Sequence, residues 1–339
     1  MKRILIVRTD RIGDVVLSTP VIKAVREALP GAFVAMLVSP YTRDIVDGNP
    51  YLNEVIALDK KKFKGLLGSA RFSGVLRKKS FDTAIVLHPM VRIHIILWLA
   101  GIRNRVGLNK KWGFLLTRRI AHTKQLGGKH EADYNLDILR LVGIEPKGRE
   151  LLVPVKEENR LKIKRILKEN ELEDGSGFVV VHPGASCPSK RWPSERFAMV
   201  ADEIINRFHK KIVIIASTNN KDFSRKMREK TENAVLDLSG SLSVGELAAL
   251  LERSKLLISN DSGPVHIAVA LGVPVVAIFG RNQPGLSSKR WGPIGKNDIV
   301  LHKDVGCIEC LAHNCALGFK CLTAIEPNKV VEAAGKLLK

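Results

Sequence analysis

The sequence predicts an α/β protein in which parallel sheets are covered by helices, divided into two domains. Short apolar runs typical of buried strands alternate along the chain with amphipathic stretches typical of helices. Strands that alternate with helices in this way favour parallel sheets. At 339 residues the chain should hold about two domains, each able to bury its own core.

The expected strands are continuous apolar runs, as in Ile4-Leu-Ile-Val7, because a parallel strand is covered on both faces. In chain order they occupy residues 4–7, 33–38, 83–87, 178–182, 211–216, 256–259 and, as the last, 273–279. The expected helices have apolar residues three to four positions apart. They occupy residues 19–28, 194–208, 222–230, 244–253 and the final segment from residue 327 onward.

The polar, charged stretch 156–177 carries no strand pattern and separates the two halves. We therefore expect one domain over residues 1–160, a second over 175–325, and a terminal helix over 326–339.

The composition is strongly basic, with 55 Lys and Arg against 34 Asp and Glu and a formal charge of +21. Such a charge favours nucleic acid, an anionic membrane surface or a polyanionic substrate as partner. An aromatic content of 5% and the lack of any nucleic-acid-binding motif argue against nucleic acid. The run before Arg8 is too short for a signal peptide, and the apolar run 93–102 falls short of the roughly 20 residues of a spanning helix.

The loop 182–193 follows an expected buried strand, and such loops line the ligand crevice in open α/β sheets. Gly184 allows close approach of the backbone, Ser186 offers a hydroxyl, and Lys190 and Arg191 are adjacent cations. These groups suit a phosphorylated ligand, although the dipeptides Pro-Gly and Trp-Pro are also common in turns that have no functional role.

A second loop, Asn260-Asp-Ser-Gly-Pro-Val-His266, lies where another strand ends and a helix begins. Asp261 or Ser262 can cap that helix, and its free N–H groups form an anion site. In a parallel sheet both loops lie on the same edge, where one diphosphate fits between them.

The segment Arg8-Thr-Asp-Arg-Ile-Gly-Asp14 leaves the first strand and enters a helix. Gly13 permits an unusual backbone angle, and Asp14 lies close to the start of the helix, where a capping carboxylate is the alternative interpretation.

Together, the segment 8–14 and the loops 182–193 and 260–266 resemble the ADP-heptose:lipopolysaccharide heptosyltransferases, nearer to the heptosyltransferase II branch. The resemblance covers nearly the whole chain. It implies the GT-B fold, in which two Rossmann-like domains face each other across a cleft, with the terminal helix packing back on the first domain. It also implies a first domain that binds the acceptor and a second that binds the nucleotide sugar.

The resemblance also assigns roles to individual residues. Asp14 matches the proposed general base, with Asp10 as the weaker candidate, and Arg8 and Arg11 are candidates for gripping acidic groups of the acceptor. On the donor side the matching residues are Lys190 and Ser186 for the phosphates, Asp222 for the ribose, and Asp261, Ser262, Gly263 and His266 for the second loop. A packed core histidine is the alternative for His266.

Four of the five cysteines, Cys307, Cys310, Cys315 and Cys321, have the spacing C-x2-C-x4-C-x5-C. Four thiolates in a short loop suit a structural zinc site. Disulfides and an iron–sulfur cluster are the alternatives, and a structural clamp, by metal or by disulfide, is favoured over a redox centre.

The expected reaction is an inverting transfer of heptose from ADP-heptose to the lipopolysaccharide inner core, with no cofactor required for catalysis. The partners implied are ADP-heptose, an anionic lipopolysaccharide precursor and the cytoplasmic face of the inner membrane, and no nucleic acid. A glycosyltransferase with another nucleotide sugar, or with a protein or capsule acceptor, is the first alternative. A basic nucleic-acid-binding protein is less favoured, and an oxidoreductase is disfavoured because neither half has Gly-x-Gly-x-x-Gly after its first strand.

Overall fold

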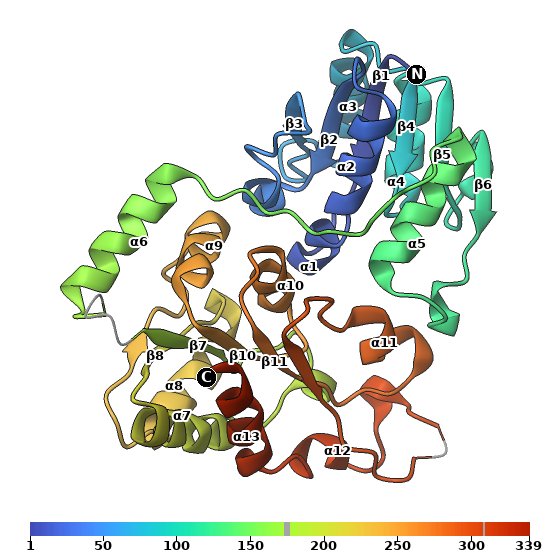
Figure 1. Ribbon diagram of the computed structural model, residues 1–339. Coiled ribbons are helices and arrows are strands. Elements are labelled where there is room, and N and C mark those ends of the chain that lie inside the picture. The colour runs from blue at the N-terminus through green and yellow to red at the C-terminus, as the bar shows by residue number, and fades with distance from the viewer. Residues whose placement is uncertain (173–176, 308) are drawn as a thin grey trace. The chain divides into compact units, whose positions relative to one another are not determined.

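Two parallel six-stranded sheets, one in each half of the chain, form the framework of the protein (Figure 1). The computed structural model describes residues 1–172, 177–307 and 309–339. The chain divides into a first unit, Met1–Pro154, and a second unit, Val155–Lys339. Each unit contains one of the two sheets.

The first sheet has the order β3-β2-β1-β4-β5-β6, and every neighbouring pair is parallel. Its central strand β1 is continuously apolar after its first residue, because both faces are covered. The strands are β1 Arg3–Val7, β2 Phe33–Val38, β3 Glu54–Ala57, β4 Thr83–Val86, β5 Asn104–Asn109 and β6 Arg118–Ala121.

The second sheet repeats this topology, with the order β12-β11-β10-β7-β8-β9 and parallel pairing throughout. Its strands are β7 Phe178–His182, β8 Lys211–Ile214, β9 Leu236–Asp237, β10 Leu256–Asn260, β11 Val275–Ile278 and β12 Asp298–Leu301. Counted from the first strand of each unit, both sheets follow the Rossmann order 3-2-1-4-5-6. The strand order reverses between β1 and β4 in the first sheet and between β7 and β10 in the second. We call these two positions the switch points, and ligands bind at such positions in open α/β sheets.

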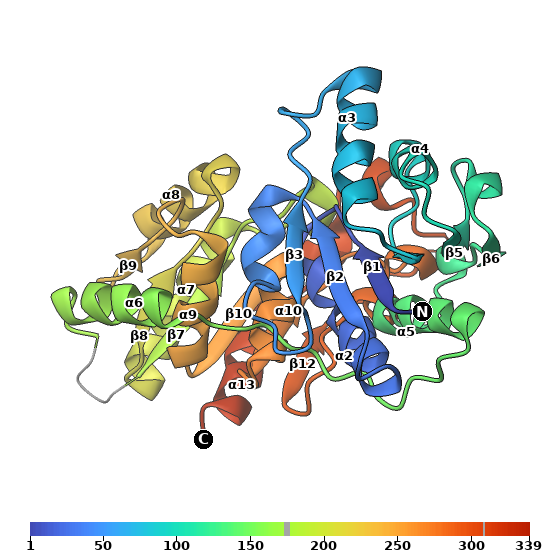
Figure 2. The same ribbon diagram turned by 90° about the horizontal axis from the view of Figure 1, so that it is seen from above.

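Helices cover both faces of the first sheet (Figure 2). Those of the first unit are α1 Ile12–Val16, α2 Thr19–Ala28, α3 Gly65–Lys78, α4 Val91–Leu99 and α5 Glu131–Asp137. In Figure 2, α3 and α4 lie on one side of the sheet and α2 and α5 on the other. Apolar side chains from α3 and α4, such as Phe72 and Ile96, complete a core with β1, β2 and β4.

The largest fully buried side chain of the second unit, Trp192, lies in a core with the helices that flank β7 and β10. The rings of Trp192 and Phe197 meet edge to face at 4.9 Å. The helices are α6 Glu157–Glu169, α7 Ser194–Phe208, α8 Lys221–Lys230, α9 Val244–Arg253, α10 Gly263–Ala270, α11 Ser288–Trp291, α12 Lys320–Thr323 and α13 Pro327–Leu337.

The terminal helix α13 belongs to the second unit, and its expected packing on the first domain stays a prediction. Val330 and Ala334 lie in the core of the second unit, and the helix packs against α7. Within the stretch 156–177, which was expected to separate the halves, residues Glu157–Glu169 form α6, and this helix packs on α9.

Several short strands were not expected, and Val275–Ile278 is followed by the further strand β12. In the part of the chain that the structure describes, no helix is long and apolar enough to cross a bilayer.

Candidate active site

The loop after β1 places Arg8 at the switch point of the first sheet, where its buried guanidinium is surrounded by acceptors. Nε donates to Asp10 Oδ1 at 2.8 Å, and Nη2 pairs with Asp14 Oδ1. Nη1 donates to Glu131 Oε1 at 3.3 Å and also to the carbonyl of Leu87, which follows β4. One arginine therefore fixes three carboxylates at the carboxyl edge of the sheet.

A second cation completes this cluster from another part of the chain. Lys124 Nζ lies 2.5 Å from Glu131 Oε1 and 3.0 Å from Asn135 Oδ1, and all three side chains are buried. His88 Nδ1 lies 3.7 Å from Asp10 Oδ2, and burial lowers the pKa of this histidine. No sequence motif pointed to Lys124, Glu131 or Asn135.

Asp14 lies in the first turn of α1 and makes no capping bond to the helix, so the capping interpretation is not supported. The pKa of its carboxyl group is raised to about 6: burial is the largest cause, the Arg8 guanidinium opposes the rise, and the nearby charges of Asp10 and Glu131 add to it. A carboxyl group with a pKa close to neutrality is suited to accept a proton.

Three further residues of the segment 8–14 had predicted roles: Arg8, Arg11 and Gly13. Arg8 is buried and engaged with carboxylates, an arrangement in which it positions Asp14, and its predicted contact with acidic groups of an acceptor stays a prediction. Gly13 is buried within α1 and is not among the residues with positive φ, so the expected unusual backbone angle is absent there. Arg11 is exposed, and its contact with an acceptor stays a prediction.

The loops after β7 and β10 are joined at the switch point of the second sheet by Asn260. Its side chain accepts from the N–H of Trp192 at 3.0 Å and donates to the carbonyl of Pro183 at 2.8 Å. His182 ends β7 beside Ser259 of β10, and its Nδ1 lies 3.2 Å from the Ser259 hydroxyl. Burial lowers the pKa of His182 to about 4, so the ring is neutral and shapes the loop.

Two cations meet on Asp261 at this edge. Lys190 Nζ lies 3.0 Å from Asp261 Oδ2, and Arg281 Nη2 donates to the same oxygen at 2.7 Å. Arg281 follows β11 and was missed by the sequence reasoning. Because Asp261 is itself anionic and already holds two cations, we assign it the orientation of those cations rather than direct contact with phosphate.

The remaining donor-loop residues surround the start of α10. The Ser262 hydroxyl lies 2.8 Å from that of Ser259 and 3.1 Å from His182 Nδ1, which fixes the entry to the helix. Gly263 opens the helix, whose first-turn N–H groups have no partners within the helix. His266 is buried one turn later, and Ser186 is exposed in the loop that leads to Lys190.

Asp222 lies in the first turn of α8, after β8, with its side chain 81% exposed. Its carboxylate Oδ1 lies 3.6 Å from Nη2 of Arg225 in the next turn of the helix. The position at the carboxyl side of the sheet suits the predicted contact with a ribose, which stays a prediction.

The four clustered cysteines carry free thiols, so the disulfide alternative is not supported. Burial raises the pKa of Cys321, and so do the neighbouring Cys315, Cys310 and Cys307. Among the described residues, no group of three or more His, Cys, Asp or Glu is arranged to hold a metal ion. The positions of the four cysteines therefore do not support the zinc site, which stays a prediction.

The cysteine segment contacts residues that are adjacent in sequence to Lys190 and Arg281. Cys321 Sγ donates to the carbonyl of Gly280 at 3.0 Å, and Cys310 Sγ accepts from the N–H of Asn282 at 3.4 Å, so the two thiols flank Arg281. His313 lies 3.0 Å from the hydroxyl of Ser189, next to Lys190. The segment thereby braces the two loops that carry the cations.

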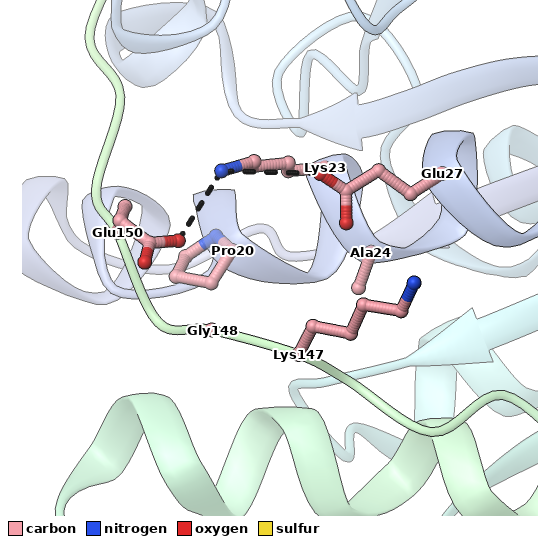
Figure 3. A pocket seen from close by; sticks show the side chains of 7 residues that line it. All are labelled: Pro20, Lys23, Ala24, Glu27, Lys147, Gly148 and Glu150. Carbon is pink, nitrogen blue, oxygen red and sulfur yellow. Dashed lines mark hydrogen bonds and ion pairs between the residues drawn. The ribbon is translucent and has the colours of Figure 1, made fainter.

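A pocket in the first unit lies between α2 and the segment 147–150 (Figure 3). Its lining residue Lys23 pairs with Glu150 at 3.3 Å and lies 3.9 Å from Glu27. None of the predicted site residues lines this pocket. Because its acidic groups oppose its cations, we do not assign the donor site to it.

Comparison with known proteins gives a family consistent with this site. The model of glycosyltransferase family 9 (heptosyltransferase) matches residues 69–320. The chain belongs to this family. Lipopolysaccharide heptosyltransferase 3 from Escherichia coli is 26% identical over 277 residues, which cover 79% of this chain and 80% of that protein.

Solved structures of the family share the fold. A family 9 glycosyltransferase from Veillonella parvula superposes with a TM-score of 0.90 and 28% identity, covering 99% of this chain and 97% of that one. ADP-heptose lipopolysaccharide heptosyltransferase II from E. coli gives a TM-score of 0.82 at 21% identity, over 100% and 98% of the two chains. The predicted family, the α/β GT-B fold class and glycosyltransferase activity are confirmed.

Proposed function

We propose that this family 9 glycosyltransferase moves L-glycero-D-manno-heptose from ADP-heptose to a sugar of the lipopolysaccharide inner core, with inversion at the anomeric carbon. The observation that carries the mechanism is Asp14, a buried carboxyl group whose pKa is raised to about 6. A sugar hydroxyl is a poor nucleophile at neutral pH, and a base of this pKa accepts its proton as the oxygen attacks.

The donor is held by the second unit in this proposal. Lys190 and Arg281, oriented by Asp261, and the first-turn N–H groups of α10 form a site for a diphosphate. As the acceptor oxygen bonds to the anomeric carbon, the bond from that carbon to the ADP oxygen breaks. The two cations and the helix N–H groups stabilise the charge that develops on ADP, and Asp14 keeps the acceptor proton.

Inversion follows from a single displacement, which needs one base and no covalent intermediate. No second carboxylate is needed as a nucleophile, so Asp10 and Glu131 are left to fix Arg8. The cations and the helix terminus neutralise the leaving group, a role that a divalent ion plays in other enzymes.

The acceptor class rests on the relatives, which include lipopolysaccharide heptosyltransferases, and on the charge of +21. Lipopolysaccharide precursors carry phosphates and carboxylates, which suit a basic protein. Because that acceptor is a membrane lipid, we place the enzyme peripherally on the cytoplasmic face of the inner membrane.

The direct test is incubation with ADP-heptose and the Kdo-lipid A acceptor, followed by mass spectrometry of the lipid. One added heptose with stoichiometric ADP release supports the proposal, and the configuration of the new bond, read by NMR, tests inversion. UDP-glucose and GDP-mannose in place of ADP-heptose are the donor controls. Transfer to protein or capsule glycan with no lipid product contradicts the acceptor assignment.

A further inference from the structure

The outer face of the α3–α4 layer exposes large apolar side chains. Every residue of α4 except Arg92 and His94 is apolar, so the helix cannot bury all of its apolar side chains against the sheet. Ile93, Ile96 and Leu97 are buried against the sheet, whereas Trp98 is 54% exposed. A helix that is apolar on its solvent side marks an interaction surface.

Further aromatic side chains adjoin this helix from the turn Gly113–Leu115, which packs on α4. His94 Nδ1 donates to the carbonyl of Trp112 at 3.2 Å. The rings of Trp112 and Phe114 lie 5.8 Å apart, and the two side chains are 52% and 65% exposed. An exposed pair of aromatic rings is unusual for a solvated turn.

The backbone that presents these rings is strained. Lys111 and Trp112 have φ of 47° and 64°, in the left-handed region that residues with a side chain rarely adopt. Strain of this kind clusters at functional sites. The turn thus holds an aromatic pair outward at a conformational cost.

Helix α3 packs against α4 (Figure 2), and its first turn adds the exposed side chains Leu66 and Leu67. Arg92 of α4 donates from Nε to the Ser69 hydroxyl of α3 at 3.0 Å, which ties the two helices together. We call the group Leu66, Leu67, Trp98, Trp112 and Phe114 the apolar patch.

The charge around the apolar patch has one sign. Residues 60–130 contain 17 Lys and Arg and a single acidic residue, so they carry +16 of the chain's formal +21. That acidic residue, Asp82, accepts from the N–H groups of Lys2 and Arg3 at the amino ends of the strands. Lys60, Lys61, Lys62 and Lys64 precede Leu66, Lys110 and Lys111 precede Trp112, and all six are exposed.

We propose that the apolar patch docks on a bilayer rich in anionic lipid. Tryptophan and phenylalanine partition to the level of the headgroups, leucine reaches the acyl chains, and lysines beside them pair with headgroup phosphates. Aliphatic side chains contribute little to nucleic-acid binding, which favours lipid over nucleic acid as the partner. The proposal rests on the proposed function only in that the acceptor there is itself a membrane lipid.

The test is co-sedimentation of the full chain with vesicles. We expect binding to phosphatidylglycerol vesicles, at least about tenfold weaker binding to phosphatidylcholine vesicles, and a loss of affinity as salt rises. W112S/F114S should weaken binding at least about tenfold through the lost apolar area. K110E/K111E should do the same through charge, while Leu161→Ser, an equally exposed apolar site on α6, should not.

Several results would overturn the docking proposal. They are binding that is equal on both lipids, binding that both double variants retain, or binding to a short DNA duplex without binding to vesicles. Circular dichroism checks that the variants are folded. Heptose transfer to a water-soluble acceptor fragment separates the two proposals: the double variants should keep it. A chain that binds vesicles but transfers no heptose would refute the proposed function and leave the docking surface standing.

Discussion

The switch points of the two sheets have the same topology and opposite arrangements of charge. In the first unit the buried Arg8 cation is surrounded by carboxylates, of which Asp14 is one. In the second unit the buried Asp261 carboxylate holds two cations, Lys190 and Arg281. The difference indicates a division of chemistry, with proton acceptance at the first edge and binding of a leaving diphosphate at the second.

The largest effect should come from Asp14→Asn, which keeps the size of the side chain and removes the base. We expect turnover to fall by about 10²–10⁴-fold, the usual contribution of a general base. ADP affinity and melting temperature should change little, because the donor is held by the second unit. Steady-state kinetics, ADP titration and thermal melting measure the three quantities.

Asp10→Asn is the matched control, because Asp10 binds the same guanidinium. It should cost much less than Asp14→Asn. Near-normal turnover in Asp14→Asn, or an equal loss in both variants, speaks against Asp14 as the base.

The second-largest effect should come from Lys190→Ala. Loss of one group that stabilises developing charge typically costs about 10²–10³-fold in rate. The rate should fall more than ADP affinity does, since the charge grows as the bond breaks. Lys255→Ala, an exposed lysine just before β10, is the control and should leave both unchanged. Equal losses of rate and affinity would reduce Lys190 to a binding residue.

A smaller effect, with a distinctive signature, is expected from Arg8→Lys. Lysine keeps the charge but cannot pair with several carboxylates through a planar fork. Because Arg8 opposes the rise in the pKa of Asp14, its replacement should move the acidic limb of the pH–rate profile to higher pH. The control is Arg11→Lys at an exposed neighbouring position, and the acidic limb of the pH–rate profile of this variant should not move. A lower rate with an unchanged limb would mean that Arg8 acts only on folding.

The smallest effect concerns the cysteine segment that flanks Arg281. If its four thiolates close on a structural metal, purified protein should contain about one zinc per chain. Cys310→Ser, which alters the group that accepts from Asn282, should lower activity by no more than a few fold, because the chemistry lies elsewhere. Elemental analysis that finds no zinc in protein purified without chelator would dismiss the metal site.

The sequence allowed prediction of the strands at the centres of the sheets, because their apolar runs are continuous. It did not reveal strands such as Arg118–Ala121 and Leu236–Asp237, which lie at sheet edges and carry charged residues. Pairing with a neighbouring strand, which no local pattern records, makes these segments strands.

The same limit applies to the site. Asp14, Lys190 and Asp261 belong to recognisable motifs that follow strands β1, β7 and β10. Glu131 is separated from Arg8 by 123 positions, and Arg281 follows a strand with no motif around it. Only the fold brings them to the switch points, although a charged residue three positions after the end of an apolar strand was a usable signal for Arg281.

The most direct test of the central claim is the pH dependence of kcat/KM for the wild-type chain. Ionised Asp14 is the active form, so activity should rise with pH through an apparent pKa of about 6 and then level off. The residual activity of Asp14→Asn should lack this limb. A wild-type profile that is flat from about pH 5 to about pH 8, or a limb that persists in Asp14→Asn, would contradict the account.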